Sequence, residues 1–469
     1  MIDRTMRASR GLPRREVLPL DGDVSFADDV RAAAADDFGH VIRRMPLGVL
    51  RPASARDIAV AVRWAADTGR GIAARGQGHS TFGRSQVDGG VVVDMTGFDE
   101  IHRTGDDRLT VGAGATWRSV LAATLPDQLV PPVLPNFLDL SVGGTLAVGG
   151  VGGTTHRYGM QTDSVCELEV VTGEGRIVTC SPRDNPELFH SVRAGLGQFG
   201  IITRATLTLI PAPTRARRYT LAYPDLGRLA ADQRLLLGED RADHLQGAIT
   251  LDAGPDGDAR AWRHQLEMVL FHDLADLPDD DAVLAGLADE RAQAQIEDMS
   301  YVDHVEAFDR FTELVRSTGE WAAPHLWWLT FLPGSAADDI ARAALAEVAP
   351  EDLGTHGMVV FSALRTSRIT TPLVRMPDDD IAFTFNLIRF APPGPVVGEY
   401  VDRVLEQNAS LYRRVLAAGG VLYPVSALSF RPQDWAEHFR DLWPAVREAK
   451  ERFDPAHCLT PGYELIVSG

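Results

Sequence analysis

The feature that most constrains this chain is a short loop with two alternating glycines, Arg75-Gly76-Gln77-Gly78-His79-Ser80. An amphipathic helix is predicted before the loop, and an apolar run that indicates a strand, Val91 to Met95, follows it. Because glycine has no Cβ, alternating glycines let successive backbone N–H groups turn toward one point, which creates a concave anion site suited to a diphosphate. His79 comes next, where its imidazole can face what the loop holds. The alternative is a tight turn with a surface histidine.

A second glycine-rich segment lies between Pro131 and Thr154. Six glycines fall within the eleven residues from 143 to 153. This density leaves little room for a conventional helix or strand, but it allows the backbone to lie against a large flat ligand. Apolar residues interrupt the glycines regularly, which disfavours the alternative of a flexible linker.

A third motif, Gly195-Leu196-Gly197-Gln198-Phe199-Gly200, matches GxGxxG letter for letter. It follows a predicted helix, 187–194, and precedes a predicted strand, 201–209. A dinucleotide-binding Rossmann unit requires the order strand, glycines, helix. The Rossmann interpretation is therefore rejected, and a nicotinamide-dependent reductase is disfavoured.

Local patterns predict several further elements. Ser54, with Asp57 three residues later, predicts a capping box at the start of a helix. The other predicted elements are a helix over 117–125 capped by Thr116, a hairpin of 165–171 with 176–180, and a helix over 432–453.

Composition narrows the class of protein. A chain of 469 residues predicts two domains. The net charge of −19 disfavours nucleic acid and anionic membranes as partners. No apolar run approaches the roughly 18 residues of a membrane span, and no export signal is evident. The three cysteines form no CxxC pair, so we expect no disulfide framework, no metal and a cytoplasmic location.

Six segments in a fixed order carry a resemblance to a known family. They are 75–80, 89–95, 141–146, 170–175, 195–205, and 453–455 with the Pro-Gly pair at 461–462. On these segments the chain resembles the FAD-linked oxidoreductases of the vanillyl-alcohol-oxidase class, whose FAD-binding domain is of the PCMH type. Within the class it is most similar to cytokinin dehydrogenases and their bacterial relatives. The segments 301–303 and 321–325 add to that similarity.

The resemblance implies an α+β fold with a particular division of the chain. Residues 1–213 would form a PCMH-type, VAO-like FAD-binding domain made of two α+β subdomains. Residues 214–425 would form a substrate-binding domain with an antiparallel sheet flanked by helices. The C-terminal segment, 426–469, would return to the FAD-binding domain.

The resemblance also implies a cofactor site. His79 would carry FAD through a covalent bond to the 8α carbon, and a single link is expected because no cysteine lies between Pro131 and Thr154. The other residues expected against FAD are Ala74, Gly76, Gln77, Gly78, Ser80, Ser141, Gly144, Ala147, Gly150, Val151, Ile202, Thr460 and Tyr463.

The chain departs from the family pattern at three positions. Asn136 stands where cytokinin dehydrogenases carry an aspartate that accepts the substrate's proton, and a carboxamide cannot serve as a general base near neutral pH. Asp139 could take the place of the missing general base only if the local backbone is irregular. In an extended segment, a residue three positions after Asn136 points to the opposite face. Arg84 and Tyr463 each replace a glutamine. We favour a changed substrate.

Two other side chains are candidates for catalysis. Tyr463 is the leading candidate for the proton acceptor, as a phenolate beside the flavin, and a ring that only packs is the alternative. Asn386 and Arg389 lie three residues apart on a predicted strand, so only one of the two side chains can face the cavity. We expect that residue to be Arg389. The alternative is that Arg389 forms a buried salt bridge. His325 and Trp327 are expected to shape the pocket or the core.

The resulting prediction is an FAD-dependent oxidase or dehydrogenase. Hydride would pass from a C–H next to nitrogen or oxygen to flavin N5. The expected substrate is an alcohol, a sugar or a secondary-metabolite intermediate, with oxygen or a quinone as electron acceptor. The alternatives are cytokinin-type amine oxidation and a flavin-binding protein or cyclase without net redox turnover. The oligomeric state is not predicted.

Overall fold

A small, mostly parallel sheet begins the fold and carries the alternating-glycine loop. The computed structural model describes residues 19–253, 260–391 and 397–466. Within them the first sheet has the order β1-β2-β4-β3, with β4 parallel to β2 and to β3. Its elements are β1 (Asp23–Ser25), β2 (Gly48–Arg51), β3 (Ile72–Arg75), β4 (Val91–Asp94), α1 (Asp28–Ala34) and α2 (Ala55–Thr68). The loop at 76–80 leaves the end of β3, as the sequence predicted.

Helix α2 begins after Ser54 as expected, but the predicted capping box is wrong. The Ser54 side chain caps no backbone N–H. The buried Asp57 carboxylate instead accepts hydrogen bonds from the backbone N–H groups of Asp21 at 2.9 Å, Gly22 at 2.9 Å and Ala53 at 2.8 Å. Asp57 therefore ties an N-terminal segment to the helix, a long-range role that the local pattern does not show.

An antiparallel five-stranded sheet, ordered β5-β6-β10-β8-β9, completes this half of the molecule. The predicted hairpin is confirmed as β8 with β9, and Thr116 caps α3 by accepting from Ser119 N–H at 3.2 Å. The GxGxxG segment lies between α6 and β10, as predicted. The elements are β5 (Ile101–Gly105), β6 (Arg108–Gly112), β7 (Leu129–Val130), β8 (Val165–Val171), β9 (Ile177–Cys180), β10 (Ile201–Thr208), β11 (Ile210–Pro211), α3 (Trp117–Thr124), α4 (Val142–Leu146), α5 (Thr155–Tyr158) and α6 (Pro186–Val192).

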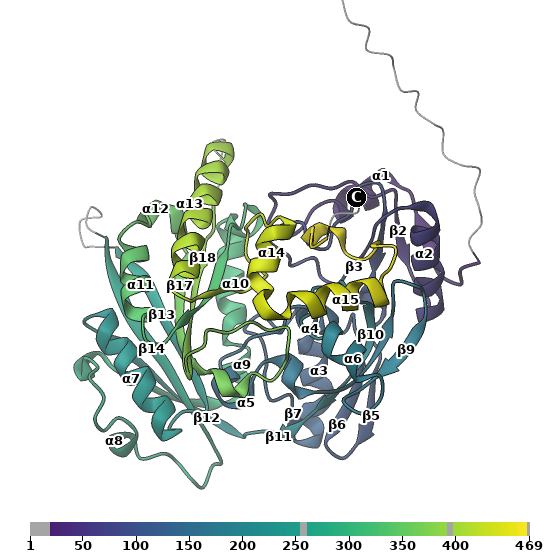
Figure 1. Ribbon diagram of the computed structural model, residues 1–469. Helices are drawn as coiled ribbons and strands as arrows, with labels where there is room; N and C mark the ends of the chain where they lie inside the picture. Colours follow the sequence, from purple (N-terminus) through teal and green to yellow (C-terminus); the bar gives the residue numbers. More distant parts are fainter. Residues whose placement is uncertain (1–18, 254–259, 392–396, 467–469) are drawn as a thin grey trace, which may run out of the picture.

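The second half is built on one antiparallel sheet, β15-β12-β14-β13-β17-β18-β16-β19, with helices on its outer face (Figure 1). Its strands are β12 (Arg215–Tyr223), β13 (His244–Ala253), β14 (Arg260–His272), β15 (Gln295–Ser300), β16 (Trp328–Pro333), β17 (Met358–Arg365), β18 (Ile381–Ile388) and β19 (Val421–Leu422). Its helices are α7 (Leu226–Glu239), α8 (Asp280–Val283), α9 (Tyr301–Val305), α10 (Ala307–Ser317), α11 (Ala337–Leu345), α12 (Pro350–Leu353) and α13 (Val397–Ala417).

Side-chain alternation gives this sheet two different faces. On β17 and β18 one set of residues packs into a core with α7, α11 and α13: Val359, Phe361, Ala363, Phe383, Phe385 and Leu387. The intervening residues, among them Val360, Ser362, Thr384 and Asn386, line a cavity toward the first half. The expected α+β, PCMH-type fold is confirmed, whereas the boundaries at 213 and 425 remain predictions.

The C-terminal segment crosses back to the first half of the molecule (Figure 1). The single helix predicted over 432–453 is wrong: α14 (Pro432–Phe439) and α15 (Trp443–Phe453) are separated by a 3₁₀ turn at 440–442. Arg440 has a φ of +48°, and Pro444 has no N–H to donate to the carbonyl four residues earlier. Beyond α15 the chain lies beside β3, where Ile72 N–H donates to Cys458 O at 2.8 Å.

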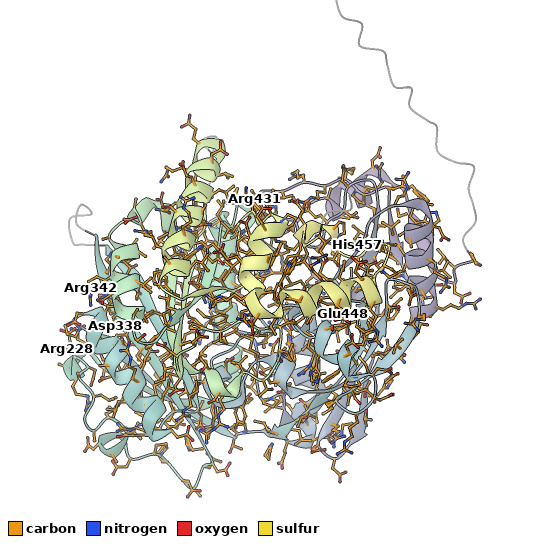
Figure 2. All side chains as sticks on the ribbon, in the orientation of Figure 1. Arg228, Asp338, Arg342, Arg431, Glu448 and His457 are labelled. Atoms are coloured by element: carbon orange, nitrogen blue, oxygen red, sulfur yellow. The ribbon has the colours of Figure 1, made fainter. Side chains whose placement is uncertain are left out.

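Helix α15 presents a polar outer side and a buried inner side. Glu448 is exposed, as Figure 2 shows, and two residues later Lys450 is buried. Lys450, the only lysine in the sequence, forms an ion pair with the buried Asp454 at 2.7 Å and donates to Gln198 O at 3.1 Å. No helix among the described residues is long and apolar enough to cross a membrane.

We predict that Lys450→Met lowers the free energy of unfolding by about 3 kcal/mol, because it leaves the Asp454 carboxylate buried without its cation. Urea unfolding followed by tryptophan fluorescence measures the change. Glu448→Gln, on the exposed side of the same helix, is the matched control and should change it by less than about 0.5 kcal/mol. Equal effects of the two substitutions would contradict the prediction.

Candidate functional site

A cavity of about 730 Å³ lies between the two halves of the molecule. Its walls are the loop after β3, the glycine-rich segment, the inner face of the large sheet and the C-terminal turn. Every residue expected against FAD lines it: Ala74, Gly76, Gln77, Gly78, His79, Ser80, Ser141, Gly144, Ala147, Gly150, Val151, Ile202, Thr460 and Tyr463. The structure thus brings these residues together, and their individual roles toward FAD remain predictions.

The two glycine-rich segments approach each other closely where they line the cavity. A Cβ on Gly76 would lie 2.0 Å from the Ser141 hydroxyl oxygen, so only glycine fits there. Gly78 has a φ of +68°, a conformation that glycine adopts at little cost. The segment 38–39 supports the loop, because Phe38 N–H donates to Gly78 O at 2.9 Å.

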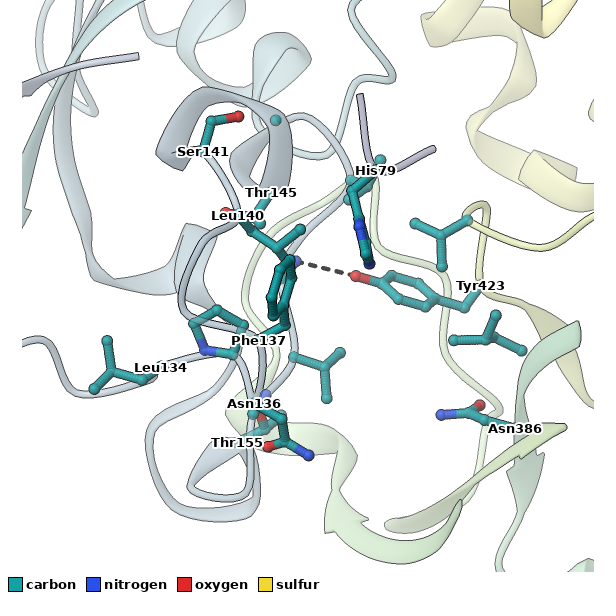
Figure 3. Close-up of a pocket in the computed structure, with 18 of the residues that line it drawn as sticks. His79, Leu134, Asn136, Phe137, Leu140, Ser141, Thr145, Thr155, Asn386 and Tyr423 are labelled. Carbon is teal, nitrogen blue, oxygen red and sulfur yellow. Dashed lines mark hydrogen bonds between the residues drawn. The ribbon is translucent and has the colours of Figure 1, made fainter. Parts of the chain in front are cut away.

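The second segment differs from its prediction, because Val142–Leu146 forms the short helix α4 despite Gly143 and Gly144. Irregular backbone follows it, with φ of +111° at Gly149 and +77° at Gly150. Gly150 N–H donates to the Tyr423 hydroxyl at 3.2 Å, shown by the dashed line in Figure 3. Glycines therefore let backbone form the cavity wall, as a large flat cofactor such as FAD requires.

His79 lines the cavity, and its ring centroid lies 5.0 Å from that of Phe137 (Figure 3). Its imidazole stacks on Phe38 with ring centroids 3.9 Å apart, and Phe38 stacks on His325 at 3.7 Å. Burial, with a smaller contribution from His325, lowers the pKa of His79 to about 3. The imidazole is therefore neutral, which is the nucleophilic form.

Carboxamides line the substrate side of the cavity. Asn136 Nδ2 donates to Gln246 Oε1 at 2.8 Å, which joins the first half of the molecule to β13. Asn386 also faces the cavity, from β18 (Figure 3). Among the described lining residues, Glu267 is the only carboxylate. The cavity therefore offers mainly neutral hydrogen-bonding groups to a substrate.

The structure contradicts two of the predicted catalytic residues. Arg389 does not line the cavity; it is fully buried and donates to Asn408 at 2.6 Å and Gln407 at 2.7 Å, so Asn386 is the residue that faces inward. The side-chain partners of Arg389 are amides rather than a carboxylate, so the alternative of a buried salt bridge is wrong as well. Asp139 is not among the residues that line the cavity, and it pairs with Arg118 at 2.6 Å.

Tyr463 lines the cavity, but its environment disfavours the expected phenolate. Burial raises the pKa of Tyr463 to about 12, although Arg84 opposes the shift. The Arg84 guanidinium lies 4.8 Å from the centroid of the Tyr463 ring and donates to Gly462 O at 3.1 Å and Leu428 O at 2.7 Å. The two departures from the family's glutamines are therefore in contact with each other, and the phenol stays protonated at neutral pH.

Sequence reasoning missed several residues of the site. Phe38, Gln246 and Tyr423 come from segments distant from the motifs and carry no local signal. Trp327 was expected only to shape the pocket, and its ring lies 5.9 Å from that of His79. None of the three cysteines, all described, lines the cavity.

Comparisons with known proteins agree with this geometry. A family model described as "FAD binding domain" matches residues 46–181, and one described as "Cytokinin dehydrogenase 1, FAD and cytokinin binding" matches residues 278–466. An uncharacterized oxidoreductase, ORF5 in the fasciation locus of Rhodococcoides fascians, is 38% identical over 93% of this chain and 98% of its own length. Cytokinin dehydrogenase 10 of Oryza sativa subsp. japonica is 32% identical, over 93% of this chain and 87% of its own.

A solved structure shows the same fold. The crystal structure of 6-hydroxy-D-nicotine oxidase from Arthrobacter nicotinovorans superposes with a TM-score of 0.74. The match covers 97% of this chain and 100% of that one, at 23% identity. At this identity the likeness establishes the arrangement of the two halves around the cavity and nothing of the substrate.

The contact between Arg84 and Tyr463 predicts coupling between the two positions. Arg84→Gln and Tyr463→Gln should each destabilise the protein. The double variant should cost about 1–2 kcal/mol less than the sum, because the desolvated cation–π contact is lost only once. Urea unfolding of all four proteins measures the coupling. Arg84→Gln combined with Tyr219→Phe, on β12, is the control and should be additive; equal coupling in both pairs would contradict the prediction.

Proposed function

Because the chain belongs to the cytokinin dehydrogenase family of FAD-linked oxidoreductases, we propose that it oxidises a C–H bond next to oxygen in a small molecule. An alcohol, a sugar or a secondary-metabolite intermediate is the proposed substrate. The carboxamides of Asn136, Gln246 and Asn386 in the cavity wall are the observation that carries this proposal. Such groups hold neutral hydroxyl-bearing molecules by donating and accepting hydrogen bonds.

Different residues of the chain would bind the cofactor, hydrogen-bond the substrate and exclude water. The loop 76–80 and the glycine-rich segment would hold FAD, which when bound supplies the acceptor for the hydride. The protonated Tyr463 would donate a hydrogen bond rather than accept the substrate's proton, given its raised pKa. The aromatic rings of Phe137, Trp321 and Trp327 would exclude water from the reacting bond.

Cytokinin-type amine oxidation is the second candidate, and the match of residues 278–466 to the cytokinin-binding family model favours it. The two candidate functions place different chemical requirements on the residue at position 136. In the second, the Asn136 carboxamide would have to be tolerated in place of the family's aspartate. A flavin protein without redox turnover, the third alternative, is excluded if any substrate reduces the flavin.

We predict that anaerobic isopentenyladenine does not bleach the flavin of the purified protein, whereas a primary or secondary alcohol from a screened panel does. Flavin absorbance measures the reduction, and dithionite provides the control that the flavin is competent. Rapid bleaching by isopentenyladenine would reject the alcohol proposal in favour of amine oxidation. Reoxidation of the reduced protein with oxygen and with a quinone would then identify the electron acceptor.

We also propose that FAD is attached covalently to His79. The neutral imidazole, held by its stack on Phe38, supports this role because a deprotonated ring nitrogen is available to bond the flavin.

The three free cysteines support the proposal that the protein is located in a reducing cytoplasm.

For His79→Ala we expect flavin to stay in the supernatant after acid precipitation, whereas the wild-type precipitate remains yellow. His102→Ala, on the exposed strand β5, is the control and should retain its flavin like the wild type. Absorbance of the redissolved precipitate at the flavin maximum gives the attached fraction. Flavin that persists in the precipitate of His79→Ala would rule out the assignment.

A further inference from the structure

Two histidines and a glutamate meet in the wall of the cavity, outside the residues assigned above to FAD. His244 lies on β13, Glu267 on β14 and His304 on α9, and all three line the cavity. One possible ligand atom from each lies within 4.8 Å of the others. Because the three residues are separated by 23 and 37 positions in the sequence, no short metal-ligand spacing revealed them.

The pleat of the large sheet brings this His244–Glu267–His304 cluster together. His244 lies two residues before Gln246 and so shares its face of β13, and Glu267 is directly opposite Gln246 in the β13–β14 register. His244 Nε2 is 3.4 Å from Glu267 Oε1. The rings of His244 and His304 meet edge to face, with centroids 4.8 Å apart.

The two imidazoles carry nitrogens without a partner. His244 Nε2 and His304 Nδ1 are buried and have no hydrogen-bond partner among the described residues. The two residues are only 9% and 7% exposed, respectively. A ligand that entered from the cavity beside Glu267 could bond such nitrogens, which are otherwise buried without a partner.

The residues around the cluster leave the His244, Glu267 and His304 atoms that face one another free to bind a ligand. Arg218 approaches the other carboxylate oxygen, with its Nη1 4.0 Å from Glu267 Oε2, and its own charge is paired with Glu297. Gly153 lies against the His244 ring, where an added Cβ would come within 2.0 Å of the imidazole. The glycine at 153 is therefore required for His244 to occupy this place.

We propose that the His244–Glu267–His304 cluster binds a divalent transition-metal ion, with Zn²⁺ as the expected species. Two imidazoles and one carboxylate are a donor set that Zn²⁺ uses in proteins, with a fourth position left for water or a substrate atom. Because all three residues line the cavity, that open position faces the substrate side. The proposal concerns a second site and does not depend on the substrate of the flavin reaction.

The test is calorimetric titration of the chelator-treated, desalted holoprotein with ZnCl₂, together with elemental analysis. One Zn²⁺ per chain is expected. Each of His244→Gln, Glu267→Gln and His304→Gln should weaken Zn²⁺ binding by at least about tenfold, because even a residue that only supports a metal ligand typically accounts for that much affinity. His102→Gln, an exposed histidine on β5, should bind like the wild type.

Two results would overturn the proposal: no Zn²⁺ binding by the wild-type protein, or binding that all three cluster variants retain unchanged. Retained flavin absorbance shows that each variant is folded. If a variant loses its flavin, the titration of the wild-type protein alone decides whether the site exists.

Discussion

The cavity depends on close contacts that glycine permits in the two glycine-rich segments. Gly76 lies so near Ser141 that a Cβ would be 2.0 Å from its hydroxyl oxygen, and Gly150 brings its N–H to the Tyr423 hydroxyl. These contacts place the loop after β3, α4 and the second half of the molecule around one cavity. A Cβ on Gly76 would meet Ser141, and a Cβ on Gly150 would meet Gln161 at 2.0 Å, so both glycine-rich segments keep their places in the cavity wall only with glycine at these positions.

The large sheet supplies the other half of the site through its pleat. Alternate residues of β17 and β18 enter a core of phenylalanines, and those between them form the cavity wall. The same alternation on β13 directs Gln246 and His244 inward. Because core packing fixes the register of these strands, the chemistry of the wall is set by side chains whose position the core has already determined.

Local signals made the fold and the cofactor side of the cavity predictable, and non-local contacts limited the rest. The loop around His79 and the hairpin at 165–180 are encoded by neighbouring residues, whereas Phe38 and Gln246 reach the site from segments with no motif. The prediction for Arg389 is wrong, although the sequence itself indicates its burial, because Phe383 and Phe385 share its parity and mark the core face of β18. Pro444 likewise signalled the break between α14 and α15.

The departures from the family pattern form local sets rather than scattered changes. Arg84 and Tyr463 contact each other, and Asn136 bonds Gln246. Gln246 does not force the amide at position 136, because a glutamine presents an N–H₂ group to a carboxylate as readily as a carbonyl to an amide. The loss of the carboxylate is therefore not a packing requirement. An amide at position 136 leaves Glu267 as the only carboxylate among the described lining residues, and Arg84 with Tyr463 adds a cation beside the C-terminal turn, so the departures alter the charge of the cavity wall at two separate places.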